Sequence, residues 1–199
     1  MALSIEERMV YRIRAKGRGW VFSARHFLDF GSRRAVDLAL FRLDKRRVIR
    51  RLGRGIYDYP RTSLTLGILS PSIDAVAKEI AGKNNSKLKI TGAQAANAMG
   101  LSTQVPARIV YLTDGRSRQL KVGKQTIILK HTSPQKMSTA GKGSGTVIEA
   151  LQYIGKETVN PVIIAKIKTA LSESDKKELK KDIGRAPDWM RPVINEIIA

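Results

Sequence analysis

Residues 32–60 run SRRAVDLALFRLDKRRVIRRLGRGIYDYP, and this stretch decides how the N-terminal region folds. Its Ser32 hydroxyl can accept a hydrogen bond from a free amide of a first helical turn, so a helix is predicted over about residues 33–46. Two strand-like runs follow, residues 48–51 and 56–59, joined through a glycine-rich tip that suits a tight hairpin. A basic helix followed by such a hairpin is the layout of a winged helix-turn-helix, which binds DNA.

The residues upstream complete this module. A capping-box pattern, Ser4 with Glu7, precedes a first helix. The apolar residues 20–22 suit a small strand, and a short helix is expected over residues 24–29. Helix, strand, short helix, basic helix and hairpin therefore predict a winged DNA-binding domain over residues 1–62.

The basic helix has two different faces on a helical wheel. Its apolar face is expected to pack on the helices before it, and consists of Val36, Ala39, Leu40 and Leu43. Base readout by a helix-turn-helix comes from the N-terminal part of its second helix, which favours Arg33, Arg34, Asp37 and Leu38. The hairpin arginines Arg50, Arg51 and Arg54 are expected to project toward phosphate or the minor groove.

The outer face of the same helix holds Arg34 and Lys45, but also Leu38 and Phe41. These two apolar side chains either touch the methyl groups of DNA bases or pack against the wing or a second subunit.

The net charge indicates an anionic partner. The chain of 199 residues has 37 Lys and Arg against 17 Asp and Glu, a net charge of +20. Residues 1–60 and 61–150 each carry a surplus of +9, whereas residues 151–199 carry only +2. Such a surplus favours duplex DNA, RNA, an acidic protein or an anionic membrane surface. The anion-facing surface is therefore expected in the first three quarters of the chain.

Residue types and segments that the sequence lacks exclude several classes of protein. The chain has no cysteine, which excludes disulfides and cysteine-based metal sites or nucleophiles. No apolar run approaches the roughly 20 residues of a membrane span, and the N-terminus lacks the pattern of a signal peptide. A soluble, cytoplasmic protein is expected.

Beyond a connector over residues 61–69, a second domain is predicted over residues 70–199. Ser70 and Pro71 suit the first turn of a helix that Gly82 ends. Strand-like and helical segments then alternate, and the last quarter is helical. The predicted fold class is therefore α+β: an N-terminal winged helix-turn-helix followed by a small mixed α/β domain with a helical C-terminus.

Three further features of the sequence could be mistaken for a binding or catalytic site. The glycine-rich residues 141–146 resemble a phosphate-binding loop. They lack the Walker A order and no strand precedes them, so a flexible start of a helix is expected instead. His26 and His131 have no neighbouring His, Cys or paired carboxylates in sequence, so no metal site, triad or cofactor is expected. A basic set that could contact nucleic acid or dock an acidic partner consists of Arg116, Arg118, Lys121, Lys124 and Lys130.

Six segments spread over the chain have a familiar combination of motifs. They are IEER (5–8), GRGWVF (17–22), RRLGRGIYDYP (50–60), GLSTQVPA (100–107), VYLTDG (110–115) and HTSP (131–134). Together they resemble the AbiEi-like antitoxin proteins of bacterial type IV toxin–antitoxin systems, and the resemblance extends from about Ile5 to Trp189.

The resemblance implies a winged N-terminal domain that binds inverted repeats upstream of its own operon and represses it. It also implies a C-terminal domain that counteracts a nucleotidyltransferase-like toxin, usually without a stable complex. Transferred to this sequence, base readout falls on Ser32, Arg33, Arg34 and Asp37, and backbone contact on Arg50, Arg51 and Arg54.

The leading hypothesis is therefore a non-enzymatic DNA-binding antitoxin and transcriptional autorepressor. A plain winged-helix transcription regulator shares every N-terminal feature. An RNA-binding protein that masks the RNA target of a toxin would use the basic strand region. An enzyme such as a nuclease has no support from a paired acidic cluster or a nucleophile–base set. A two-fold symmetric operator would suggest a homodimer on DNA.

Overall fold

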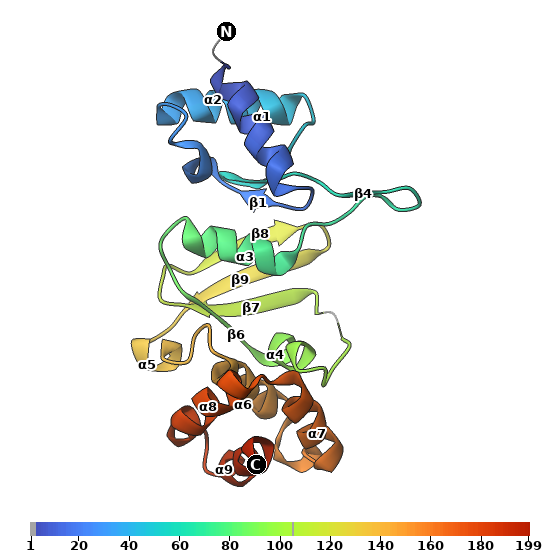
Figure 1. The fold of residues 1–199 in the computed structure, drawn as a ribbon, viewed down its shortest axis with the longest axis vertical. Coiled ribbons are helices and arrows are strands. Elements are labelled where there is room, and N and C mark those ends of the chain that lie inside the picture. The colour runs from blue at the N-terminus through green and yellow to red at the C-terminus, as the bar shows by residue number, and fades with distance from the viewer. Residues whose placement is uncertain (1–2, 105) are drawn as a thin grey trace. The chain divides into compact units, whose positions relative to one another are not determined.

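The structure, a computed structural model, describes residues 3–104 and 106–199 and has a mixed α+β fold (Figure 1). The chain forms two compact units. The first comprises residues 1–85 with Leu120–Lys124, and the second comprises Ser86–Gln119 with Gln125–Ala199. Each unit has its own apolar core.

The first unit begins with the predicted order of elements: α1 (Ile5–Lys16), β1 (Val21–Phe22), the 3-10 helix η1 (Ala24–Phe27), α2 (Arg33–Lys45), β2 (Arg50–Gly53) and β3 (Ile56–Asp58). It continues with β4 (Thr62–Ser63), β5 (Gly67–Ile68) and α3 (Ile73–Gly82). The strands β1, β3 and β2 form an antiparallel sheet in that order, with β3 in the centre. The N-terminal unit thus has helices packed with a small wing-like sheet, as predicted.

Local sequence signals set the helix starts. The Ser4 hydroxyl accepts the Glu7 amide, and the Glu7 carboxylate accepts the Ser4 amide, so the predicted capping box is present. The Ser32 hydroxyl accepts the amide of Ala35 and begins α2. At the tip of the β2–β3 hairpin Gly55 has a φ of +70°, a conformation that a side chain would disfavour.

The core of the first unit lies between α1, η1, α2 and the sheet. The predicted apolar face of α2 is confirmed, because Val36, Ala39, Leu40 and Leu43 are all buried. An aromatic group packs against it, with the rings of Phe22 and Phe27 edge to face at 5.5 Å. Burial of this apolar surface holds the two helices and the sheet together.

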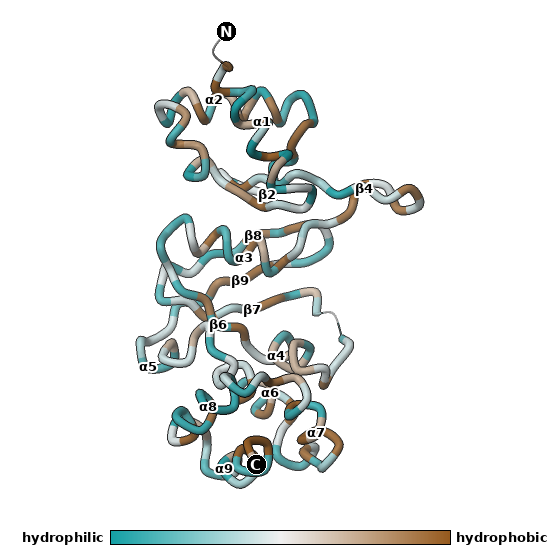
Figure 2. Tube along the Cα trace, in the orientation of Figure 1, coloured by the Kyte–Doolittle hydropathy of each residue, from teal (hydrophilic) through white to brown (hydrophobic). Residues whose placement is uncertain are grey.

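The segment predicted as a connector has more structure than expected. Residues 62–68 form a short antiparallel hairpin, β4 with β5, whose turn is permitted by Gly67 at a φ of +68°. Its apolar side chains Leu64, Leu66 and Ile68 are exposed, and Figure 2 marks hydrophobic residues in the loop after β4. Because these residues bury nothing, the hydrophobic pattern of the sequence did not reveal the hairpin.

The start of α3 also differs from the prediction. The capping residue is Ser72, whose hydroxyl accepts the Ala75 amide, and Pro71 lies before the helix. Ser70 does not cap α3, because it lies two residues before the N-cap position of a helix that begins at Ile73.

Ion pairs join α3 to η1 within the first unit. The carboxylate of Glu79, only 6% exposed, accepts from Arg25 at 2.9 Å and lies 3.0 Å from the Nε2 atom of His26. Burial raises the pKa of the Glu79 carboxyl, but the hydrogen bonds from His26 and Arg25 outweigh burial, so the pKa lies below its ordinary value of 4.5. This buried charge is stabilised only while its partners are in place.

The second unit begins with a mixed sheet and ends in helices. Its elements are β6 (Leu88–Ile90), α4 (Gly92–Ala98), β7 (Arg108–Thr113), β8 (Arg118–Val122, which continues into the first unit), β9 (Gln125–His131), α5 (Pro134–Met137), α6 (Gly143–Ile154), the 3-10 helix η2 (Lys156–Thr158), α7 (Pro161–Ala170), α8 (Glu173–Asp182), the 3-10 helix η3 (Ile183–Arg185) and α9 (Met190–Ile198). The strand order is β6-β7-β9-β8; β6 and β7 are antiparallel, whereas β7 and β9 are parallel. The predicted mixed sheet and helical C-terminus are confirmed.

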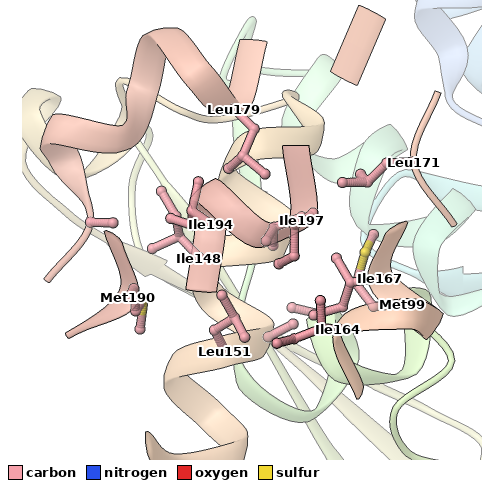
Figure 3. Close-up of a cluster of buried hydrophobic side chains, with 14 residues drawn as sticks. Met99, Ile148, Leu151, Ile164, Ile167, Leu171, Leu179, Met190, Ile194 and Ile197 are labelled. Atoms are coloured by element: carbon pink, nitrogen blue, oxygen red, sulfur yellow. The ribbon is translucent and has the colours of Figure 1, made fainter. Parts of the chain in front are cut away.

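The C-terminal helices share one apolar core. Leu151 of α6, Ile167 of α7, and Ile194 and Ile197 of α9 are fully buried within it. Figure 3 shows these side chains directed toward one another, with Leu179 of α8 above them. Burial of these side chains stabilises the last quarter of the chain as a set of packed helices.

The Glu79 cluster generates a prediction on pH and stability. We expect Glu79→Gln to lower the free energy of unfolding by about 1–3 kcal/mol near neutral pH, because Arg25 and His26 lose a charged partner. Folding lowers the pKa of this carboxyl group. The group therefore stabilises the fold above the pKa of the unfolded state, and this stabilisation is lost as the pH falls through the pKa of the folded state. The difference between wild type and Glu79→Gln should therefore shrink below pH ~4. Chemical denaturation from about pH 3 to pH 7 measures it.

The matched control is Glu157→Gln, which changes an exposed carboxylate in η2. It should leave stability nearly unchanged at every pH. A Glu79→Gln deficit that stayed constant over the whole pH range would contradict the assignment of the stabilisation to the charged carboxylate.

Candidate nucleic-acid interface

The exposed face of α2 is the candidate interface. Since the opposite face is buried, the helix must present Arg34, Phe41 and Lys45 to solvent, together with Leu38. Leu38 is 48% exposed and Phe41 is 54% exposed. Arg34 makes no hydrogen bond or ion pair to any residue that the structure describes, so its guanidinium is available to a partner.

One flank of this face is held by a pair one helical turn apart. The Nε atom of Arg33 donates to Oδ2 of Asp37 at 2.9 Å. Both side chains are more than half exposed, so the pair adds little to stability. Its effect is orientation: Asp37 occupies one donor of Arg33 and leaves the rest of the guanidinium for a ligand.

The same flank continues onto the sheet. Oδ1 of Asp44 accepts the backbone amide of Arg51 at 3.1 Å, which ties the end of α2 to β2. Tyr57 of β3 lies close by, and burial raises the pKa of its hydroxyl against the opposing charge of Arg51. The exposed side chain of Arg51 therefore lies beside the charged flank of α2.

Arg50 has a different environment from the other predicted contacts. Its guanidinium donates twice to the buried Asp58, at 3.0 and 2.6 Å, and once to the carbonyl of Leu69 at 3.0 Å. Asp58 is 1% exposed, so Arg50 neutralises a carboxylate that has no access to solvent. These bonds occupy three of the five N–H donors of the guanidinium within the fold, and we do not include Arg50 in the interface that we propose below.

The tip of the wing is supported from one side. Nζ of Lys83 donates to the carbonyl of Arg54 at 3.3 Å. A Cβ at Gly53 would lie 2.4 Å from a methyl carbon of Leu120, so a side chain there would require the Leu120 side chain to move. The side chain of Arg54 itself is exposed.

The five residues of the second basic set are all exposed, but they do not belong to one unit. Lys121 and Lys124 lie with the first unit, and Arg116, Arg118 and Lys130 lie in the second. They come from the turn before β8, from β8, from the turn between β8 and β9, and from β9. We do not treat them as a single surface.

The glycine-rich segment over residues 141–146 has a packing role. A Cβ at Gly145 would lie 2.3 Å from the carbonyl oxygen of Thr139, which excludes a side chain. The carboxylate of Asp182 accepts from the Ser144 hydroxyl at 2.7 Å and from Lys142 at 3.2 Å. An acidic side chain therefore already neutralises the lysine of this segment, which disfavours binding of a phosphate there.

The two histidines belong to different units. His26 belongs to the Glu79 cluster, and Nδ1 of His131 lies 2.9 Å from the carbonyl oxygen of Gly115. Within residues 3–104 and 106–199, no group of three His, Asp or Glu side chains could hold a metal ion. No helix in the same ranges is long and apolar enough to cross a membrane.

A polar cavity of about 840 Å³ in the second unit was not anticipated from the sequence. Lys89 of β6 and Glu149 of α6 form an ion pair across 3.0 Å in its wall, and Lys136 and Arg185 also line it. Lys89 is only 10% exposed. The alternation of residues 87–91 places Lys89 on the polar face of the strand. Its burial beside Glu149 of α6 therefore depends on the tertiary structure.

Arg50 binds a buried carboxylate whereas Arg54 is exposed, so their replacement should change the free energy of unfolding differently. Arg50→Ala should lower the free energy of unfolding by about 3 kcal/mol, because it leaves Asp58 buried without a counter-charge. Arg54→Ala, the matched control at the exposed tip, should change it by less than about 0.5 kcal/mol. Urea denaturation of both variants measures the difference. Equal stability of the two variants would contradict a structural role of Arg50.

Comparison with known proteins identifies a family for this chain. No curated protein matches the chain. The crystal structure of the Rv2827c protein from Mycobacterium tuberculosis matches with 13% sequence identity and a TM-score of 0.45, over 98% of this chain and 76% of that one. Residues 8–179 match the family of unknown function DUF6088, and the chain therefore belongs to that family.

Proposed function

We propose that this protein is a DNA-binding antitoxin that represses its own operon and counters a nucleotidyltransferase-like toxin. Its N-terminal unit would bind the operator, and the second unit would supply the antitoxic activity. The protein would act without catalysis of its own. The AbiEi-like motifs in the sequence are the reason for choosing an antitoxin over a plain winged-helix regulator.

The observation that supports DNA binding most is the free basic face of α2. The helix is held by its buried residues on one side, and Arg34 projects from the other side without a partner among residues 3–104 and 106–199. A helix of this kind fits the major groove, where an arginine can donate twice to the O6 and N7 atoms of guanine. Arg33, Arg51 and Arg54 flank it with exposed charge suited to phosphates.

Binding to the upstream region of its own gene tests the DNA-binding part of the proposal. Fluorescence anisotropy should show a preference of ~10³-fold or more over a scrambled duplex of the same length. A salt series then separates the two components of binding, because phosphate contacts weaken with salt and base contacts much less. Equal, steeply salt-dependent binding to both duplexes would contradict a specific repressor and would favour RNA as the target.

Two arginine variants should distinguish base-specific contacts from general attraction to the phosphates. Arg34→Ala is expected to cost ~1–3 kcal/mol on the specific duplex and to relax base preference. Arg54→Ala is expected to weaken all duplexes alike and to reduce the salt slope by about one unit. Lys156→Ala, an exposed lysine of the second unit, is the control. A loss of the same size for Arg34→Ala and Arg54→Ala on random DNA would show that α2 does not read bases.

The antitoxin part has its own test. Full-length protein should restore growth of cells that express the toxin encoded beside it, and Arg34→Ala should restore growth equally well if the two units act separately. Repression without any rescue would leave a plain transcription regulator.

A further inference from the structure

The outer face of α2 contains two apolar side chains that the fold leaves unburied. Leu38 and Phe41 lie three residues apart, which places them as neighbours on one side of the helix. About half of each side chain is exposed, at 48% and 54%. Exposure of two large apolar groups beside each other costs free energy in water, and a partner would recover it.

Charge around the two residues selects the kind of partner. Arg34 and Lys45 are exposed on the same face, and Nζ of Lys45 lies 5.6 Å from the ring centre of Phe41. The nearby acidic side chains are already engaged: Asp37 is paired with Arg33, and Glu6 and Glu7 of α1, which line a shallow pocket together with Leu38, are bound to Arg46 and to the Ser4 amide respectively. A second copy placed on this face about a two-fold axis would bring like charges together, which is unfavourable. A polyanion such as duplex DNA is attracted to the same cations.

The major groove presents one apolar group to such a helix, the C5-methyl group of thymine. Residues three apart on a helix are separated by about 4.5 Å along its axis. This rise is comparable to the ~3.4 Å spacing of bases along one strand, so the two side chains can meet neighbouring base pairs.

We propose that Phe41 and Leu38 recognise the methyl groups of thymines at neighbouring positions of the operator. The inference rests on the proposed DNA-binding function and names the bases that the site prefers. Arg34 would anchor the same helix on a guanine one turn earlier, and Lys45 would contact phosphate beyond Phe41. Sequence preference then arises from apolar contact as well as from hydrogen bonds.

Replacement of thymine by deoxyuridine removes only the methyl group and therefore tests this contact directly. The full-length protein is first used to select duplexes from a pool with about 20 randomised base pairs. Each thymine of the selected duplex is then changed to deoxyuridine in turn, and affinity is measured by anisotropy. At two neighbouring positions the loss should be roughly fourfold, the free energy of removing one methyl group from its contact.

A double-mutant cycle assigns the methyl groups to the side chains. In Phe41→Ala and Leu38→Ala, the corresponding deoxyuridine change should cost nothing further, because the contact is already lost. Tyr153→Ala, which removes an exposed aromatic ring from α6, is the matched control and should retain the full fourfold loss. Phe41→Ala and Leu38→Ala change exposed residues, so the temperature of thermal unfolding of each variant should match that of wild type.

The outcomes distinguish this inference from the function on which it rests. Failure to select any sequence would contradict the proposed repressor. Selection of a sequence that is indifferent to deoxyuridine, or a loss that persists unchanged in Phe41→Ala, would overturn the methyl contact while leaving the repressor intact. A change of oligomeric state in Phe41→Ala, seen by sedimentation of the free protein, would also overturn it and assign the face to a second copy.

Discussion

Burial of one face of α2 is the constraint on which the candidate interface depends. Val36, Leu40 and Leu43 are fully excluded from solvent between α1, η1 and the small sheet. A helix that is anchored in this way cannot rotate without exposing its apolar side chains, at a cost of about 1.5–3 kcal/mol for each one. The direction of Arg34 and Phe41 is therefore determined by residues that never meet a ligand.

Ion pairs with buried carboxylates complete the frame of the first unit. Asp58 is held by Arg50, and Glu79 is held by Arg25 and His26. In a chain with 37 basic residues, the few buried acids organise cations that would otherwise repel one another. The basic residues thus have two roles: some neutralise buried acids, and others remain exposed and give the surface its charge. A count of charges along the sequence does not separate the two.

The second unit follows the same pattern. The carboxylate of Asp182 binds Ser144 and Lys142 at the start of α6. Glu149 pairs with Lys89 in the wall of the polar cavity. Gly145, in the first turn of α6, is explained by close packing against the carbonyl oxygen of Thr139. A sequence motif that resembles a phosphate-binding loop can therefore arise from the steric needs of a helix start.

The sequence alone determined the local structure of this protein. Caps, turn glycines and the spacing of apolar residues act over a few residues, so α1, α2, the wing hairpin and the packed face of α2 were all predictable. The tertiary structure decided what depends on distant partners: the pairing of Arg50 with Asp58, the joining of η1 to α3 through Glu79, and the parallel pairing of β7 with β9. It also decided that the β4–β5 hairpin forms although its apolar residues are exposed. The physical reason is range, because hydrogen bonds and ion pairs between distant segments leave no periodic signal in the chain.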